Sequence, residues 1–351
     1  MSSKTKVLIT GATGYIGGSI LNRLLERSDL KSSIEIRALV RSTEKAKKLE
    51  EFGVVPVIGS HVDEPVMVQA VSEVDILIAV TDCDNVQAAQ IALKGMKKRF
   101  DETGKQPIYI ECSGTGVYVD QTGGMSSTDV VYDDANPDQI ETLAPTQPHR
   151  NVDLEILAAD KEGYIKSYIV LPPTVYGIAT GALVDAGICN PHSIQIPVLI
   201  RACLPRRQGG MVGAGKNVWN NVEIHELADF FVILLEAILT NKEGVGHGRE
   251  GIYNVVNGEH DHYQLAEAIS QAFVALGLGD DPKPSTFTPE EEQKYLGVFA
   301  PFYGTNSRCL ATRARALGWK PKKTTEDMLA GIKTEVETLL STKKIDSLRA
   351  V

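Results

Sequence analysis

The chain has 351 residues, of which 43% are hydrophobic and 23% charged, a composition typical of a globular protein with a sizeable core. The formal net charge of -9 argues against a nucleic-acid or anionic membrane partner, because no basic surplus is present to neutralise phosphates. The 5 cysteines have no CxxC spacing, which argues against a disulfide framework. No N-terminal leader precedes the first predicted strand, so we expect a cytoplasmic protein.

Short runs rich in Val and Ile alternate with helical patterns over the first half of the chain. In the helical stretches, apolar residues recur at the spacing of one helix face, as at Ile16, Ile20 and Leu24. Alternating strands and helices require crossovers and form a parallel sheet covered on both faces. The sequence therefore predicts an α/β fold, a Rossmann-like doubly wound parallel sheet. Its strands are expected at 7–10, 34–40, 54–58, 75–80, 107–111 and 167–171.

Residues 117–148 break this alternation, since they are polar, rich in Gly, Pro and Asp, and without a sustained period. A loop of this length in a compact domain is usually a lid, a binding loop or disordered. Later in the chain the pattern predicts helices at 193–204, 225–239 and 263–276 and a strand at 251–257. His260 and His262 are interpreted as solvated residues of a turn, and no metal site is expected.

The stretch "TGATGYIGG" places Gly11, Gly14 and Gly17 directly after the first strand and at the start of a helix. In dinucleotide-binding proteins such glycines permit a tight turn, a close approach of the backbone to pyrophosphate, and close packing of helix on strand. The sequence therefore predicts a dinucleotide site, with Thr13, Tyr15 and Ile16 in the same turn. The stretch "GMVGAGKN" (210–217) resembles a phosphate loop but ends in Asn where Ser or Thr is needed, and is expected to be a loop.

The end of the second strand indicates which dinucleotide is bound. An acidic residue there would accept from the ribose 2'-hydroxyl of NAD, whereas this strand is followed by Arg41 and Ser42. A guanidinium offers a planar fork to the 2'-phosphate of NADP, and Arg37 lies on the same strand face by its spacing. NADP(H) is therefore favoured over NAD(H). Glu44 lies nearby and keeps NAD(H) open as the alternative.

Several spaced motifs together resemble the extended short-chain dehydrogenases/reductases of the NAD-dependent epimerase/dehydratase type, and residues 40–60 resemble the NmrA-like branch. The motifs are "GATGYIGG", "LPPTVYG" (171–177), "VGAGKNVWNNVEIHELAD" (212–229), "GIYNVVNGE" (251–259) and "ARALGWKP" (314–321). The resemblance implies a nucleotide-binding domain over 1–175 plus 216–258 and a smaller mixed α/β C-terminal substrate cap over 176–215 plus 259–351.

The resemblance also implies positions around the cofactor. Pro172 and Pro173 would lie beside the nicotinamide, and Val80 and Thr81 would lie along the cofactor. Ser60 and His61 would lie near the adenine.

The chain departs from the family at its catalytic residues. The family uses Ser or Thr after the fifth strand and a Tyr-x-x-x-Lys helix, which is missing here. Ser113 and Thr115 flank the place of the first element, and His149 and Asp153 stand where Tyr and Lys are expected. Residues four apart share a helix face, so the Asp153 carboxylate would lie beside the His149 imidazole. A carboxylate in that position fixes the tautomer of the ring and makes the imidazole a proton donor or acceptor. Alternatively, His149 merely opens a helix, and Tyr118, Tyr132 and Tyr176 are rival donors.

Two classes of function follow. The first is an NADP(H)-dependent oxidoreductase acting on a carbonyl, enone or hydroxyl of a small organic substrate, with an isomerase or dehydratase as its non-redox variant. In it, Ser113 or Thr115 binds the substrate oxygen and His149 supplies the proton. The second is an NADP-binding redox sensor without turnover, as the resemblance to NmrA-like proteins suggests. Either is expected as a monomer or homodimer.

Overall fold

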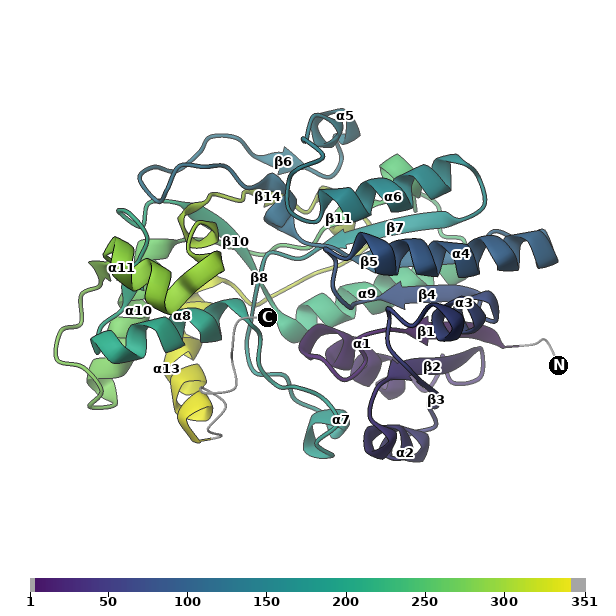
Figure 1. Cartoon of the computed structure of the whole chain (residues 1–351), viewed down its shortest axis with the longest axis horizontal. Helices are drawn as coiled ribbons and strands as arrows, with labels where there is room; N and C mark the ends of the chain where they lie inside the picture. The colour runs from purple at the N-terminus through teal and green to yellow at the C-terminus, as the bar shows by residue number, and fades with distance from the viewer. Residues whose placement is uncertain (1–3, 342–351) are drawn as a thin grey trace.

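The computed structural model describes residues 4–341 and is built around one large sheet (Figure 1). Seven strands lie in the order β11-β7-β5-β4-β1-β2-β3, and every pairing between neighbours is parallel. This confirms the predicted doubly wound fold. The strands are β1 Thr5–Ile9, β2 Ile34–Val40, β3 Val55–Ile58, β4 Ile76–Ala79, β5 Ile108–Cys112, β7 Lys166–Leu171 and β11 Ile252–Asn254.

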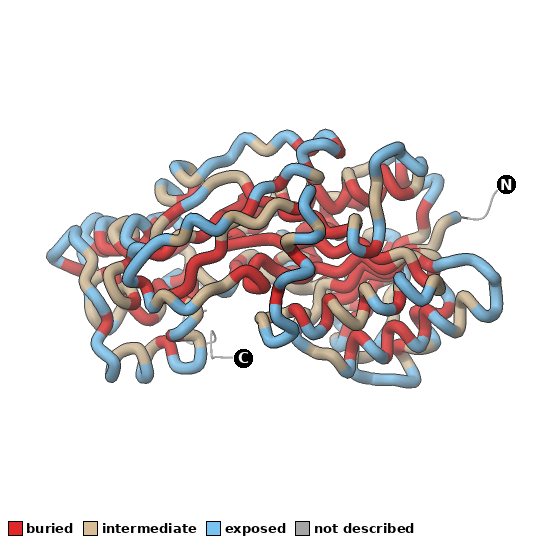
Figure 2. The backbone as a smooth tube through the Cα atoms, turned by 90° about the horizontal axis from the view of Figure 1, so that it is seen from above, coloured by how far each residue is buried: buried red, intermediate tan, exposed pale blue. Residues whose placement is uncertain are grey.

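The two faces of the sheet are covered by different helices. Val7 and Ile9 belong to one buried cluster with residues of α1 and α9, whereas Leu8 between them belongs to a second cluster with residues of α3, α4 and α6. Successive side chains of a strand point to opposite faces, so a strand buried on both faces is a continuous apolar run. Figure 2 shows these central strands as the most buried part of the chain. The helices are α1 Tyr15–Glu26, α2 Thr43–Glu51, α3 Glu64–Ser72, α4 Val86–Thr103, α6 Arg150–Lys161 and α9 Ile224–Leu239.

The remaining elements form a separate hydrophobic cluster at the other end of the molecule (Figure 1). It is built on α8 Gln195–Cys203, α10 His262–Ala275 and α13 Thr325–Ser341. A three-stranded sheet of β12, β10 and β8 continues from the large sheet toward these helices. Its strands are β8 Thr174–Tyr176, β10 Val218–Glu223 and β12 Glu259–Asp261. The domain boundaries inferred from the sequence stay a prediction.

Short elements complete the chain. They are β6 Tyr132–Asp133, β9 Gly210–Met211, β13 Ser285–Thr286, β14 Cys309–Leu310, α5 Pro137–Glu141, α7 Ala182–Asp185, α11 Pro289–Glu291 and α12 Thr312–Ala316. The segment 117–148 is ordered by two of them: β6 pairs with β14, and α5 begins at a cap in which Asn136 accepts from the Gln139 amide at 3.3 Å. This long loop is therefore held by residues far away in the sequence, which its own pattern could not indicate.

The prediction that His260 and His262 are solvated is wrong. They are 1% and 2% exposed, and their rings stack with centroids 5.9 Å apart. Burial lowers the pKa of His260 to about 3 and that of His262 to about 4. The polar sequence around them hid this, because the covering residues come from other segments. For example, the Asn221 amide group lies 3.2 Å from His260 Nδ1.

Within residues 4–341, none of the helices is long and apolar enough to cross a membrane.

Candidate functional site

The strand order places a crevice between β1 and β4, where the connections leave in opposite directions. In open parallel sheets, ligands bind at such a switch point, outside the carboxyl ends of the strands. The glycine-rich turn follows β1 at this point, residues 80–85 follow β4, and residues 113–118 follow β5. The two predicted sites, one for a nucleotide and one for catalysis, therefore share one edge of the sheet.

The glycine-rich turn has the geometry of a dinucleotide loop. Gly11 has φ +66, and a Cβ there would come 2.6 Å from the Val80 carbonyl oxygen. A Cβ on Gly17 would come 2.3 Å from the Gly11 carbonyl oxygen, so both glycines permit close packing. Gly14 caps α1, and a Cβ there would meet only the Gly11 carbonyl oxygen, at 3.1 Å. The open side of Gly14 and the free amides of the first helical turn fit a pyrophosphate.

The other residues of the turn are held by the segment that follows β8. The Tyr15 hydroxyl donates to the Gly177 carbonyl at 2.6 Å, and the Thr13 carbonyl accepts from the Asn190 amide at 3.2 Å. Ile16 is half-buried at the start of α1. These contacts position the turn against the neighbouring chain.

The end of β4 contacts the same turn. The Val80 amide donates to Thr10 Oγ1 at 3.1 Å, which joins the carboxyl ends of the neighbouring parallel strands β1 and β4. Thr81 Oγ1 is buried and has no hydrogen-bond partner within the described chain. A buried hydroxyl without a hydrogen bond lowers the stability of the fold, and a hydrogen bond to a bound ligand would offset this loss.

β2 is followed by an arginine, Arg41. Arg41 is exposed and makes no hydrogen bond or ion pair with any residue in the part of the chain that the structure describes. The Ser42 hydroxyl caps α2 by accepting from the Lys45 amide at 3.2 Å. Arg37 does not join Arg41, because it is paired with Glu35 and Glu73, each at 2.9 Å. Its placement on the same face therefore contributes no second phosphate ligand.

The two residues predicted near the adenine follow β3. Ser60 and His61 are half-buried, and His61 Nε2 lies 3.9 Å from Asp82 Oδ2. A small cavity of about 20 Å³ lies between His61, Thr81 and Glu111.

Ser113 and Thr115 lie where β5 ends and a short 3-10 turn, η1 (Thr115–Tyr118), begins. They are 5% and 0% exposed, and neither hydroxyl has a hydrogen-bond partner within residues 4–341. The Thr115 amide donates to the Pro172 carbonyl at 2.9 Å, which brings the buried Pro172 and Pro173 to the same place. The structure thus brings together the candidate hydroxyls and the two prolines.

His149 precedes α6 in a left-handed conformation, with φ +65. Its ring lies over the backbone of η1: a Cβ on Gly116 would come 2.7 Å from His149 Nε2, and one on Gly114 would come 3.2 Å from it. The two glycines thereby leave room for the imidazole. Gly114 stands where the family's Ser or Thr is expected, so the histidine fills space that a side chain there would take.

The carboxylate that contacts His149 is Asp84 and not the expected Asp153. His149 Nδ1 lies 2.8 Å from Asp84 Oδ1 and 3.2 Å from Cys83 Sγ. Sequence reasoning missed Asp84 and Cys83 because they come from the loop after β4, 65 residues or more away. The available signal was the polar segment "TDCDN" at the carboxyl end of a buried strand.

Asp153 is a buried residue of α6 near the Ser113 hydroxyl. It is 2% exposed, and burial raises the pKa of its carboxyl to about 6, although the nearby Ser113 hydroxyl and the Arg150 guanidinium favour the charged form. Burial also raises the pKa of Glu111 well above its usual range, and the Asp153 charge adds to this. Asp153 and Glu111 are thus buried carboxyl groups that border the candidate hydroxyls and do not pair with the imidazole.

Two of the three rival tyrosines use their hydroxyls elsewhere. Tyr118 donates to Asn254 Oδ1 at 2.9 Å, and Tyr176 donates to the Thr324 carbonyl at 2.8 Å. Tyr132 stacks on the Tyr118 ring with centroids 4.5 Å apart. These contacts favour His149 over Tyr118 and Tyr176 as the proton donor.

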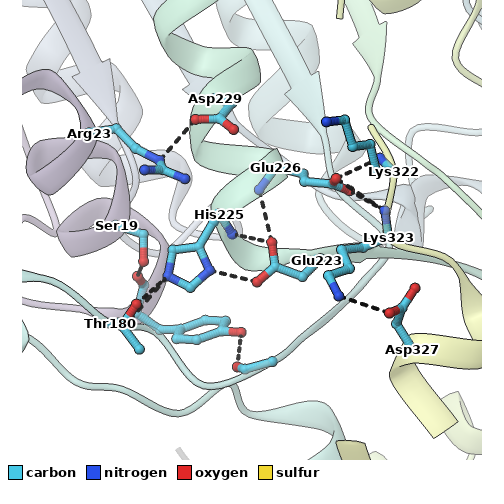
Figure 3. Close-up of polar contacts among 12 residues, drawn as sticks. Ser19, Arg23, Thr180, Glu223, His225, Glu226, Asp229, Lys322, Lys323 and Asp327 are labelled. Carbon is cyan, nitrogen blue, oxygen red and sulfur yellow. Dashed lines mark hydrogen bonds and ion pairs between the residues drawn. The ribbon is translucent and has the colours of Figure 1, made fainter. Parts of the chain in front are cut away.

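A groove of about 780 Å³ lies elsewhere, between α1, α9 and residues 319–323. Figure 3 shows that its polar groups mostly pair with one another. Glu223 binds His225 Nδ1 at 2.6 Å, Arg23 binds Asp229 at 2.9 Å, and the Lys322 amide donates to Glu226 at 2.6 Å. None of the predicted site residues lines this groove, so it is separate from the candidate site.

Comparisons with known proteins agree with the observed fold. The model of the NmrA-like family matches residues 3–96. The oxidase ucsJ of Acremonium sp. is 30% identical over 336 residues, which cover 90% of this chain and 92% of the relative. A farnesyl-dihydroquinoline-oxide ketoreductase of Stigmatella aurantiaca is 32% identical over 72 residues, 20% of each chain. DesIV, a dTDP-glucose 4,6-dehydratase of Streptomyces venezuelae solved with NAD bound, has the same fold, with a TM-score of 0.65 and 18% identity over 96% of this chain and 98% of its own. The chain therefore belongs to the same family as the oxidase ucsJ, with an NmrA-like N-terminal part and the fold of DesIV.

Proposed function

We propose that the protein is an NADP(H)-dependent oxidoreductase acting on a carbonyl, enone or hydroxyl of a small organic substrate. One observation carries this: of the thirteen buried side-chain polar atoms without a hydrogen-bond partner among the described residues, five belong to the segments that follow β4 and β5 and to the start of α6. Within residues 4–341 these five atoms are Thr81 Oγ1, Ser113 Oγ, Thr115 Oγ1, Arg150 Nε and Asp153 Oδ1. Leaving such atoms unpaired costs about 1 to 3 kcal/mol each, which a bound ligand would offset.

The roles of the residues follow from their positions. The Ser113 and Thr115 hydroxyls hold the substrate oxygen, and His149 Nε2, which faces the same turn, exchanges a proton with it. The glycine-rich turn holds the pyrophosphate, and Arg41 pairs with the 2'-phosphate. When bound, the nicotinamide supplies or accepts the hydride. The two named relatives, an oxidase and a ketoreductase, support redox chemistry on this fold.

The test begins with a screen of aldehydes, ketones and enones for oxidation of NADPH, with substrate loss followed in parallel to detect an isomerase. On a substrate found in this way, His149→Phe should lower kcat by about 10²- to 10⁴-fold, because it removes a general acid. The affinity for NADPH should barely change. His247→Phe, which alters an exposed histidine paired with Asp160, should keep full activity.

A second variant probes the position of the ring without removing it. Gly116→Ala places a Cβ 2.7 Å from His149 Nε2, so the imidazole must move and kcat should fall. Gly331→Ala, where a Cβ would meet nothing within 4 Å, is the matched control. Full activity of His149→Phe would refute the assignment. If no substrate turns over while NADPH and NADP bind with clearly different affinities, the protein is a redox sensor.

A further inference from the structure

One oxygen atom of Asp84 holds both the backbone and the ring of His149. Asp84 Oδ1 accepts from the His149 backbone amide at 3.0 Å and lies 2.8 Å from His149 Nδ1. A residue other than glycine at φ +65 is in a sparsely populated conformation. The first contact stabilises that conformation, and the second turns the ring.

The protonation of the ring follows from its partner. The hydrogen bond with His149 is the main reason that the pKa of Asp84 is lowered, so this carboxylate is charged and can only accept. A bare Nδ1 at 2.8 Å would place two lone pairs against each other, so Nδ1 carries the proton. Nε2 is then the atom that gains and loses a proton, and it faces Gly114 and Gly116.

Cys83 does not replace Asp84 as the hydrogen-bond partner of His149 Nδ1. Its Sγ lies 3.2 Å from His149 Nδ1, but burial raises the pKa of the thiol well above its usual range, and the Asp84 charge adds to this. The sulfur stays a neutral thiol, which is a weak partner for a ring N–H.

We propose that Asp84 is the positioning residue of the reaction, and this rests on the proposed function of His149. Asp84 fixes the tautomer and the direction of the ring, so that Nε2 meets the substrate oxygen. A bound NADPH would supply the hydride to the substrate carbon. The step that belongs to this chain is the proton transfer, in which the N–H bond at Nε2 breaks and an O–H bond forms at the substrate oxygen. The imidazolium becomes a neutral ring protonated at Nδ1, and Asp84 stays charged throughout.

The test combines ring spectroscopy with kinetics. In ¹⁵N-histidine-labelled protein, the His149 signals are identified by their loss in His149→Phe. Near neutral pH, the neutral wild-type ring should be protonated at Nδ1, whereas Asp84→Ala should show a mixture of tautomers. On a substrate from the screen, Asp84→Ala should lower kcat by about tenfold to a hundredfold, with KM within about twofold, because the ring loses the partner that orients it.

Two further variants separate positioning from general damage. Asp84→Asn should recover most of the tautomer preference, because the His149 backbone amide would orient the amide oxygen toward Nδ1. Asp101→Ala, which removes an exposed carboxylate near the far end of α4, should match wild type in both measurements. An unchanged tautomer in Asp84→Ala would overturn the proposal, as would an unchanged kcat. A changed tautomer together with an active His149→Phe would instead refute the proposed function while the ring contact stands.

Discussion

At the scale of single residues, Arg41 and Ser42 differ in whether their side chains are free to bind a phosphate. Both follow β2, where the sequence indicated a 2'-phosphate site. In the structure, the Ser42 hydroxyl already caps α2, whereas the Arg41 guanidinium is exposed and unpaired among the described residues. A free guanidinium can bind a phosphate with two parallel hydrogen bonds. Any preference for NADP(H) should therefore depend on Arg41.

The change Arg41→Ala tests this. The affinity for NADPH should fall by about tenfold or more, since a charge-assisted hydrogen bond contributes about 1.5 to 3 kcal/mol. The affinity for NADH, which lacks the 2'-phosphate, should stay within about twofold. Fluorescence titration of both nucleotides measures this, with Lys47→Ala on the exposed face of α2 as the control. Equal NADPH affinity in wild type and Arg41→Ala would contradict the assignment.

At the scale of elements, the segment 177–190, which we call the strap, joins the glycine-rich turn, α1 and α2. Asn22 on α1 accepts from the Leu183 amide at 3.3 Å, and a Cβ on Gly18 would come 2.5 Å from Cys189 Sγ. Lys45 on α2 donates to the Ile188 carbonyl at 2.6 Å. The strap therefore packs on two of the helices that border the predicted nucleotide site.

Loosening the strap should be measurable by amide exchange. In Asn22→Ala the buried Leu183 amide loses its acceptor, which costs about 1 to 3 kcal/mol. Hydrogen exchange followed by mass spectrometry should therefore show faster exchange over 177–190, while β1 and β4 keep wild-type rates. Lys47→Ala should leave the strap unchanged. Unaltered exchange over 177–190 in Asn22→Ala would mean that the other contacts hold the strap alone.

At the scale of the whole molecule, some buried titratable groups make the fold less stable as the pH falls, and others make it more stable. Burial lowers the pKa of His260 to about 3 and that of His262 to about 4, below the value of about 6.5 for an exposed imidazole. Between these values the unfolded chain binds more protons, so these histidines reduce stability as pH falls. Burial raises the pKa of Asp134 to about 7 and that of Asp153 to about 6, which stabilises the fold as pH falls.

The buried histidines and the buried aspartates change the free energy of unfolding in opposite directions as the pH falls, and a substitution can separate the contribution of one histidine. His262→Phe removes a group that is uncharged in the folded state and protonated in the unfolded state at pH 5. Relative to wild type, its free energy of unfolding should rise by about 2 kcal/mol between pH 8 and pH 5. Urea denaturation at the two pH values measures this, and the comparison cancels any constant packing change. Tyr263→Phe, at the exposed neighbouring position, should show a flat difference. A flat difference in His262→Phe would mean that the ring is not buried neutral.

The sequence by itself determined the parallel sheet and the glycine-rich turn. Both depend on local signals: apolar runs at strand spacing, and glycines where a backbone must turn or pack closely. The strands predicted over the first half of the chain reappear as β1, β2, β3, β4, β5 and β7, with β2 at the predicted bounds and the other ends shifted by at most two residues. Ser113, Thr115 and His149 were singled out by the resemblance to a family whose catalytic residues stand at or beside those positions, and their roles stay a prediction.

Only the tertiary structure decided which groups touch. Helical spacing pointed to Asp153 as the partner of His149, but the left-handed backbone at His149 turns the ring toward the loop after β4, where Asp84 binds it. The burial of His260 and His262 and the ordering of residues 117–148 likewise depend on segments far away in the chain. Periodicity reports which face of an element is apolar, whereas a contact between loops depends on where the whole chain brings their ends together.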